Sequence, residues 1–574
     1  MKVSESVTSP GLPSGDRLVV CFLPGHATQL GSVDLAALLY NHRSAGKQAD
    51  SNPITSYDLD RCLSFLIRQQ IIISFYQTND DVFQNAFLRT IIIHGVKDEN
   101  IKFAPDTLGV LEEPVASSLV LTPSFRAPYK KVWRLYEDTN GCFFTAVQPC
   151  QTTPFVQLDA PLTNNGLLAV AVPSRLRYQP SSDQPLAGLR IAVKDNLHLA
   201  GLKTSLCNKA YYNVYPKRTK TAKCNQQLLD AGAVVLGKTK MNSFGCWEEP
   251  TEYIDYQAPW NPRADGYQSP GGSSSGSGAA VAAYGWIDIT IGTDTGGSVA
   301  RPGLWNGCFA MRPSFGLVPV EGLVTSIKAF DMPGLLGRDL HDCKNLIHHW
   351  YGSKSSLRTE AFTRIVWASD FWGWCGPKSR DLAERFVLDL EAVAGLSHEK
   401  ISFREKWAET CPEVANGTSL DDYMQLPADD IWYDDYHNHE NFRADYWKRF
   451  QKAPYIRPAV RNGWDYAKTI TQLARDEAVA RLEIYRVWFS KNIMNEGEGH
   501  TMLMVPIEDM EPRYRDEFMD PVRGHPGVCA LLLAPVIKAP QLVVPIGEIP
   551  YKSKVTELEA VLPFAVGSLG LPDL

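Results

Sequence analysis

Two runs rich in glycine and serine lie close together near the middle of the chain. The run "SPGGSSSGSG" occupies residues 269–278, and "GTDTGGS" occupies residues 292–298, directly after the alternating run "WIDITI". Glycine admits positive φ and lets successive backbone N–H groups converge on an anion. A serine at the end of such a turn could attack a carbonyl carbon while the turn's amides hold the oxyanion. Ser298 occupies that position and is a candidate nucleophile.

The first run is open to three interpretations. Its composition is typical of a flexible surface loop. The segment "GSSSG" at 272–276 also matches a nucleophile elbow with Ser274 as the nucleophile, but the polar, turn-rich "PRADGYQSP" stands where an elbow requires a buried strand. In the third interpretation both runs build one active site, which then needs a base. The nearest histidines, His198 and His341, lie in no such setting, so the base must come from another residue type.

Three segments, in this order and at this spacing, resemble the amidase signature family: "IAVKDNL", "SPGGSSSGSGAAVAA" and "IGTDTGGS". The resemblance covers about residues 185–340, and later segments resemble fungal members that carry an extra N-terminal unit. It implies an α/β fold with a central mixed β-sheet covered by helices. It further implies a triad of Ser298 as nucleophile, Ser273 as bridging serine and Lys194 as base. The family's oxyanion hole would be formed by the backbone amides of Thr295, Gly296, Gly297 and Ser298, with Gly272, Ser274 and Asp294 in support.

A relay of this kind places demands on the bridging serine and on the lysine. In the family the peptide bond before that serine is cis, here between Gly272 and Ser273. Its hydroxyl should lie within about 3.3 Å of both the Lys194 amine and the Ser298 hydroxyl. A free lysine has a pKa of about 10.4, and burial can lower it by up to about 3–5 units. The strand "RIAVK" would carry the Lys194 amine into the core and leave it neutral enough to accept a proton.

The sequence departs from the family beside the proposed nucleophile. The family usually has an arginine two residues after this serine, whereas here Ala300 stands there and Arg301 follows. If that arginine normally pairs with the aspartate of the turn, Asp294 must be supported differently or the turn has changed. The departure keeps open a non-catalytic binding protein that has retained the fold.

The organisation of the chain predicts several parts. Residues 1–150 read as an N-terminal α+β accessory domain, with "RLVVCFL", "IIISF" and "RTIIIHGV" as strand candidates, and 151–188 as a connector. Residues 189–574 read as the amidase signature domain, because a helix over "AKCNQQLLDAG" alternates with strands. Within it, 340–500 is predicted to be a helical, substrate-shaping insertion, with one long helix over 464–494. The runs "HTMLMVPI" and "APQLVVPIGEI" are predicted strands that return to the main sheet.

The composition of the chain limits the kinds of binding partner that we expect for the protein. The net charge of −7 gives no reason to expect nucleic acid, and no apolar run is long enough to span a membrane. With no secretory segment and scattered cysteines, we expect a cytoplasmic protein with reduced thiols. We expect a small-molecule amide as substrate and no cofactor or metal, and a homodimer is compatible with the sequence. The acidic, aromatic stretch 430–447, which includes His437 and His439, reads as a solvated loop rather than a metal site. Its aromatic residues fit a pocket mouth or ordinary packing equally well.

Four functions therefore remain. The first is hydrolysis of a carboxamide through an acyl-enzyme. The second is amide formation or acyl transfer, because an amine can capture the same acyl-enzyme in place of water. The third is release of ammonia from glutamine for a partner enzyme, and the fourth is ligand binding without catalysis.

Overall fold

The computed structural model describes residues 5–7, 18–20, 80–82, 133–158, 163, 165–351, 361–495, 497, 499–518 and 527–571. The chain forms two compact units, Met1–Arg134 with Pro173–Arg177, and Leu135–Val172 with Tyr178–Leu574. In the first unit, β1 (Glu5–Val7) pairs antiparallel with β2 (Leu18–Val20), which lies within the predicted strand "RLVVCFL". The other two N-terminal strand candidates lie outside the described residues.

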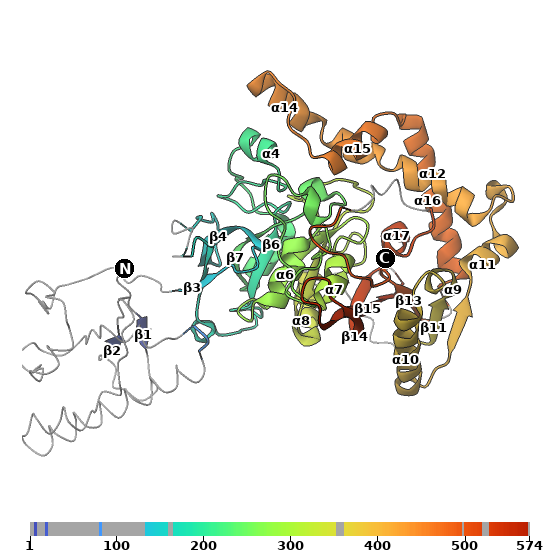
Figure 1. Ribbon diagram of the computed structural model, residues 1–574, viewed down its shortest axis with the longest axis horizontal. Coiled ribbons are helices and arrows are strands. Elements are labelled where there is room, and N and C mark those ends of the chain that lie inside the picture. Colours follow the sequence, from blue (N-terminus) through green and yellow to red (C-terminus); the bar gives the residue numbers. More distant parts are fainter. Residues whose placement is uncertain are drawn as a thin grey trace, which may run out of the picture. The chain divides into compact units, whose positions relative to one another are not determined.

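An eleven-stranded mixed sheet forms the centre of the second unit, in the order β12-β11-β13-β15-β14-β9-β10-β8-β6-β7-β4 (Figure 1). Its strands are β4 (Phe143–Cys150), β6 (Arg190–Lys194), β7 (Val234–Thr239), β8 (Ile289–Asp294), β9 (Phe309–Arg312), β10 (Met332–Gly337), β11 (Arg364–Ala368), β12 (His398–Ile401), β13 (Thr501–Pro506), β14 (Gln541–Lys552) and β15 (Glu559–Leu569). A separate two-stranded sheet joins β3 (Arg134–Glu137) to β5 (Ala169–Val172). The α/β class and the mixed sheet predicted from the sequence are confirmed.

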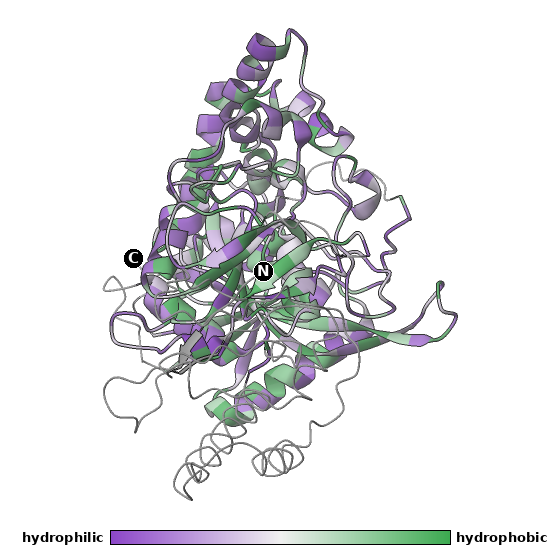
Figure 2. Ribbon diagram, turned by 90° about the vertical axis from the view of Figure 1, so that its left-hand side faces the viewer, coloured by the Kyte–Doolittle hydropathy of each residue, from purple (hydrophilic) through white to green (hydrophobic). Residues whose placement is uncertain are grey.

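The helices that accompany this sheet are α4 (Lys209–Val214), α5 (Lys223–Asp230), α6 (Ser275–Ala283), α7 (Ala300–Asn306), α8 (Leu340–Tyr351), α9 (Ser369–Trp372), α10 (Pro377–Ala394), α11 (Phe403–Thr410), α12 (Leu420–Asp430), α13 (Tyr433–Asn438), α14 (Glu440–Phe450), α15 (Pro458–Ala467), α16 (Gln472–Asn492) and α17 (Ala530–Val536). Helices α12 and α16 lie above strands β11 and β13 in the view of Figure 1, whereas α14 lies beside α4. Hydrophobic residues concentrate on the central strands, and the helices at the top of Figure 2 are largely hydrophilic. In the described part of the chain, none of the helices combines the length and apolar composition needed to cross a bilayer.

Three details differ from the sequence prediction. Strand β4 ends at Cys150 and pairs with β7, so the main sheet already includes residues before the expected boundary at 150. The region 340–500 is not purely helical, because β11 and β12 extend the sheet. The long helix expected over 464–494 is two helices, α15 and α16, because the Thr471 side chain accepts a hydrogen bond from the Ala474 amide and caps a new helix there.

The run 269–278 is buried throughout, and its second half forms the start of α6. Its glycines lie against close neighbours: a Cβ on Gly276 would come within 2.4 Å of the Cys142 carbonyl oxygen, and one on Gly278 within 2.7 Å of the Asn306 side chain. Larger residues could not occupy these positions without moving their neighbours. The run therefore has the composition of a linker because it packs closely, and the flexible-loop interpretation is wrong.

Candidate active site

The position of Lys194 follows from two parallel neighbours in the sheet. Strand β6 ends at Lys194 and β8 ends at Asp294, and the two run parallel with Val193 opposite Ile291. Carboxyl ends of parallel strands open onto the same edge of a sheet, which is where ligands bind in many α/β proteins. The lysine and the Gly-rich turn that follows β8 are therefore brought together by strand register.

The Lys194 amine lies in the protein interior, with its side chain fully buried. Its Nζ donates to the Ser273 hydroxyl at 2.8 Å and to the Thr293 carbonyl at 3.1 Å. Burial lowers the pKa of Lys194 to about 7, although the carboxyl groups of Asp294 and Asp331 act in the opposite direction. A substantial fraction of this amine is thus neutral near pH 7, as a proton acceptor requires.

The peptide bond between Gly272 and Ser273 is cis, as expected from the sequence. A Cβ on Gly272 would lie 2.5 Å from the side-chain amide of Asn242, so only glycine fits there. Asn242 is fixed in turn: its Nδ2 donates to the Glu248 carbonyl at 2.7 Å, its Oδ1 accepts from the Tyr253 hydroxyl, and its backbone amide donates to the Ser273 carbonyl at 3.1 Å. No motif in the sequence marked Asn242 or Tyr253 as part of the site.

Ser274 joins the two serine-containing loops. Its backbone amide donates to the Ser298 carbonyl at 3.1 Å, and its buried hydroxyl donates to the Thr293 carbonyl at 3.2 Å. The same hydroxyl accepts from the Thr293 amide at 3.3 Å. These bonds hold Ser274 inside the fold, and a loop rather than a buried strand precedes it. The elbow interpretation, with Ser274 as nucleophile, is therefore not supported by its surroundings.

The turn that carries Ser298 is organised by Asp294. The Asp294 carboxylate accepts from the Gly297 amide at 3.2 Å and from the Val299 amide at 2.7 Å. Gly297 has a φ of +94°, and α17 packs over it so that a Cβ would lie 2.6 Å from Leu531. The backbone amides of Thr295, Gly296 and Ser298 donate no hydrogen bond to any of the described residues. The Gly297 amide, by contrast, is already engaged by the turn itself.

The Ser298 side chain is half-buried and lines the same pocket as Ser273. The structure forms the Lys194–Ser273 hydrogen bond, but, within the part of the chain that it describes, none joins the Ser273 and Ser298 hydroxyls. The first half of the expected relay is thus formed and the second half is not. Hydrogen bonds of this kind are often long or misaligned until substrate is bound.

The question raised by Ala300 has a structural answer. Arg312, at the end of β9, donates to the Asp294 carboxylate at 2.9 Å and to the Asp294 carbonyl at 3.0 Å, and both side chains are buried. Ala300 and Arg301 are therefore not needed to support Asp294. Arg301 instead pairs with Glu508 at 2.9 Å and with Glu249 at 3.2 Å. Sequence reasoning missed Arg312, because nothing in "FAMRPS" indicates that its side chain reaches the turn.

Asp331, which precedes β10, holds the other side of the turn. It accepts from the Thr295 hydroxyl at 2.5 Å and from the Ser326 amide at 2.6 Å. Burial raises the pKa of Asp331 to about 7, against the effect of these hydrogen bonds. Thr295, which lines the pocket, is thus held by its side chain.

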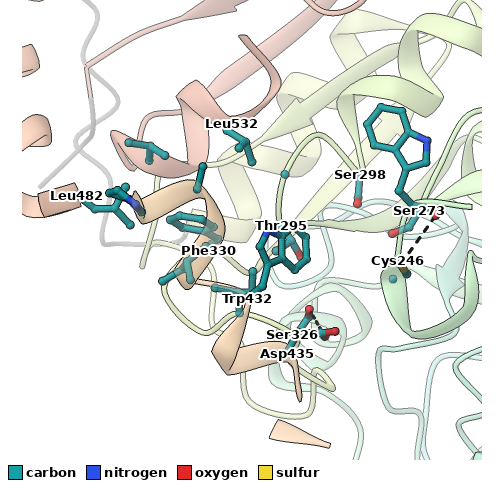
Figure 3. Close-up of a pocket in the computed structure, with 18 of the residues that line it drawn as sticks. Cys246, Ser273, Thr295, Ser298, Ser326, Phe330, Trp432, Asp435, Leu482 and Leu532 are labelled. Atoms are coloured by element: carbon teal, nitrogen blue, oxygen red, sulfur yellow. Dashed lines mark hydrogen bonds between the residues drawn. The ribbon is translucent and has the colours of Figure 1, made fainter. Parts of the chain in front are cut away.

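A pocket of about 870 Å³, including its open mouth, begins at these residues (Figure 3). Ser273 and Ser298 lie at one end of the pocket in Figure 3, and Thr295, Trp247 and Arg301 also line it. Leu482 lies on the side opposite the serines in Figure 3. The remaining wall is mainly apolar and is formed by Ile327, Phe330, Met424, Pro427, Ala428, Ile431, Trp432, Leu532 and Val536. A mainly apolar lining with a few polar groups at one place is typical of a small-molecule site.

The stretch 430–447 contributes directly to this pocket through Ile431, Trp432 and Asp435. Its histidines are used locally: His437 lies 2.5 Å from Glu440, and the His439 ring bonds the Asp435 carbonyl at 2.8 Å. Among the described residues, no group of three or more His, Cys, Asp or Glu side chains lies close enough together to hold a metal ion. Most of the stretch is helical, in α13 and α14, so the loop interpretation is wrong. The other two both apply, because part of the stretch lines the pocket and Phe442 packs in the core.

Comparison with known proteins now identifies the region that carries the site. Residues 163–364 match the amidase family. The matched residues include Lys194, Ser273 and Ser298. Among curated proteins, it is 40% identical over 161 residues to a glutamyl-tRNA(Gln) amidotransferase subunit from Desulforudis audaxviator, which is 28% of this chain and 31% of that protein. It is 39% identical over 164 residues to the protein of the same name from Lachnoclostridium phytofermentans, again 28% of this chain and 32% of the relative. The chain thus spans about a third of the length of these relatives.

Solved structures match the chain over a longer stretch. A structure described as an amidase superposes with a TM-score of 0.54 at 23% identity, over 68% of this chain and 82% of that chain. A 6-aminohexanoate cyclic dimer hydrolase bound to its substrate superposes with a TM-score of 0.54 at 20% identity, over 69% and 83%. At these identities the likeness establishes the fold around the matched residues.

Proposed function

We propose that this protein is an amidase that hydrolyses a carboxamide C–N bond through an acyl-enzyme on Ser298. The observation that carries the proposal is the buried Lys194 amine, 2.8 Å from the hydroxyl of Ser273, which lines the same pocket as Ser298. A lysine with a pKa of about 7 is poised to exchange protons near neutral pH. The amidase-family match over 163–364 includes all three residues.

The proposed reaction passes one proton along the triad. Ser298 attacks the amide carbon and gives its proton to Ser273, whose own proton goes to neutral Lys194. The C–N bond then breaks, and the proton returns through Ser273 to the leaving amine. Water then attacks the ester carbon and gives one proton through Ser273 to Lys194. The ester C–O bond to Ser298 breaks, that proton returns to the Ser298 oxygen, and the water oxygen leaves in the carboxylic acid. Each step needs the Ser298 hydroxyl to turn toward Ser273, a contact that bound substrate would favour.

Charge develops on the carbonyl oxygen during both attacks. We assign its stabilisation to the backbone amides of Thr295, Gly296 and Ser298, because the Gly297 amide donates to Asp294. Amides fixed in advance stabilise an oxyanion without reorganising at the moment of reaction. Asp294, Arg312 and Asp331 would act by holding this turn in place.

A fluorophosphonate probe tests the nucleophile without knowledge of the substrate. We expect it to label the wild-type protein on Ser298 and to leave Ser298→Ala unlabelled. A panel of aryl, alkyl and peptide amides then identifies what is hydrolysed. Persistent labelling in Ser298→Ala would contradict the assignment, and absence of labelling in the wild type would favour a binding protein.

Acyl transfer is the second candidate, because the relatives named above belong to amidotransferases. An amine can capture the acyl-enzyme in place of water without any change in the triad. Product analysis with and without an added amine separates the two reactions. Ammonia release from glutamine, measured on the same preparation, tests whether the chain supplies ammonia to a partner.

A further inference from the structure

The apolar part of the pocket contains one carboxylate. Asp435, in α13, lines the pocket together with Ser326, and Figure 3 shows the two side chains paired below Trp432 and away from Ser298. The Asp435 side chain is only 13% exposed. A carboxylate removed from water at an apolar wall is unfavourable unless charge or hydrogen bonds compensate it.

Hydrogen bonds fix the orientation of this carboxylate. Its Oδ1 accepts from the Ser326 hydroxyl at 2.6 Å, and its Oδ2 accepts from the Trp464 indole N–H at 2.7 Å. Ser326 is itself held, because its backbone amide donates to Asp331 and its carbonyl accepts from Asn438. Each carboxylate oxygen can accept a second bond, so the group is pre-positioned and retains acceptor capacity.

Asp435 forms no ion pair with a lysine or arginine among the described residues. Arg443, whose guanidinium lies 4.9 Å from the centre of the Trp464 ring, attracts the Asp435 carboxylate through space without pairing with it. The only ion-pair partner found for Asp435 among the described residues is His439, at 3.8 Å, and burial lowers the pKa of that imidazole, so it is neutral at pH 7. The pocket's other charged wall residue, Arg301, is in the opposite situation, since both Glu508 and Glu249 pair with it. Asp434, which precedes Asp435 on α13, also differs from it. Asp434 pairs with Arg475 at 2.9 Å and does not line the pocket.

We propose that Asp435 binds a positively charged amine on the substrate, so that the enzyme acts on amides with an apolar body and a protonated amino group. This deepens the proposed function and rests on it, because the amide is taken to reach Ser298 from the same pocket. The apolar wall would cover the hydrocarbon part of the substrate. A cation at Asp435 would complete a partly buried ion pair, an interaction that favours one partner strongly over its neutral analogue.

The first experiment measures binding and does not depend on hydrolysis. Phenylbutylamine and phenylbutanol are titrated calorimetrically into Ser298→Ala at about pH 7.5, where the amine is protonated because its pKa is near that of lysine, about 10.4. We expect the amine to bind at least about tenfold more tightly than the alcohol, as close ion pairs at interfaces do. Equal binding of the two ligands by folded Ser298→Ala would overturn the proposal without any substitution at Asp435.

Substitution then assigns the preference to one residue. In the Ser298→Ala background, Asp435→Asn should reduce the amine-to-alcohol preference to about onefold, whereas the matched neighbour Asp434→Asn should keep it. Asparagine retains the size of the side chain, and thermal melting checks that each variant is folded. A preference that survives in folded Asp435→Asn, or disappears equally in folded Asp434→Asn, would overturn the assignment.

Hydrolysis by the otherwise unmodified enzyme separates this inference from the proposed function. Two phenyl amides are compared, one with a dimethylaminomethyl group and one with an isobutyl group of the same shape. We expect kcat/KM to favour the cationic amide by at least about tenfold and Asp435→Asn to reduce that ratio. Hydrolysis of both at equal rates contradicts the amine site alone. If the protein binds the amine in preference to the alcohol but hydrolyses neither amide, the amidase proposal is contradicted and the amine site is still supported.

Discussion

The serine end of the pocket and its apolar end are built by different means. At the serine end, Lys194, Ser273 and Ser298 stand on strand ends and tight turns, and short polar bonds fix their neighbours. At the apolar end, residues such as Met424 from α12, Leu482 from α16 and Leu532 from α17 meet across helices that are far apart in sequence. One end depends on hydrogen-bond geometry and the other on side-chain volume.

We expect the serine end to carry out the reaction and the apolar end to determine which amide is accepted. The amidase match ends at residue 364, so every lining residue from Met424 onward lies outside it. A catalytic group that is displaced by even a small distance loses much of its effect on the rate, whereas an apolar wall tolerates substitution by apolar side chains of similar volume. We therefore expect substitutions at the serine end to change rate for all amides and those at the apolar end to change the choice of amide.

The largest effect is expected at Ser298. Ser298→Ala removes the attacking atom and should lower kcat by about 10⁵-fold or more, because members of a triad act as a unit. The thermal unfolding temperature should stay near that of the wild type, since no hydrogen bond to the Ser298 hydroxyl is formed in the described structure. Turnover on the best amide and melting are measured together. A variant that keeps most of its activity would remove Ser298 from the mechanism.

Lys194 provides the next largest effect. Lys194→Arg should lose activity by about 10³-fold or more, close to the loss in Lys194→Ala, because arginine stays protonated and cannot accept a proton. If Lys194→Arg were largely active, the residue would supply only positive charge. Both variants need a melting measurement, since the amine also bonds the Thr293 carbonyl in the interior.

The same lysine predicts a pH profile. Its pKa is lowered to about 7, so the amine is charged below that pH and neutral above it. We expect kcat/KM to fall about tenfold per pH unit below 7 and to level off above it. The profile should be the same for long and short amides, because it belongs to the serine end. An acid limb centred near pH 4 would instead indicate a carboxylate as the base.

Arg312 tests the support of the nucleophile turn. Arg312→Ala leaves the buried Asp294 carboxylate without its partner, which costs about 3–5 kcal/mol in the free energy of unfolding. A shifted turn should also lower kcat by about 100-fold. Arg385→Ala, at an exposed position of α10, is the control and should change stability by less than about 0.5 kcal/mol. An unchanged stability in Arg312→Ala would contradict the view that Arg312 replaces the arginine missing at Ala300.

These residues show what the sequence could and could not reveal. The strand "RIAVK" and the Gly-rich run at 292–298 predicted β6 and the turn after β8, because both features are local in sequence. The cis bond was expected only from the resemblance to the amidase signature family. Arg312 and Asp331 reach the turn only through sheet pairing, so their roles depend on contacts between distant segments. The pocket residues carry an ordinary helical pattern, which predicts that they are buried but not which of them face a cavity.

The smallest effect is expected at the apolar end and should depend on the substrate. Leu482→Ala removes volume from the wall opposite the serines, and the loss of a few methylene contacts should lower kcat/KM about tenfold for amides long enough to reach it. Short amides should be hydrolysed at nearly the wild-type rate, because the triad does not touch Leu482. Leu473→Ala is the matched control, since it lies on the same helix with 80% of its surface exposed and does not line the pocket. Kinetics on a series of amides of increasing length measure the effect, and an equal loss for every length would show that the two ends of the pocket are not independent.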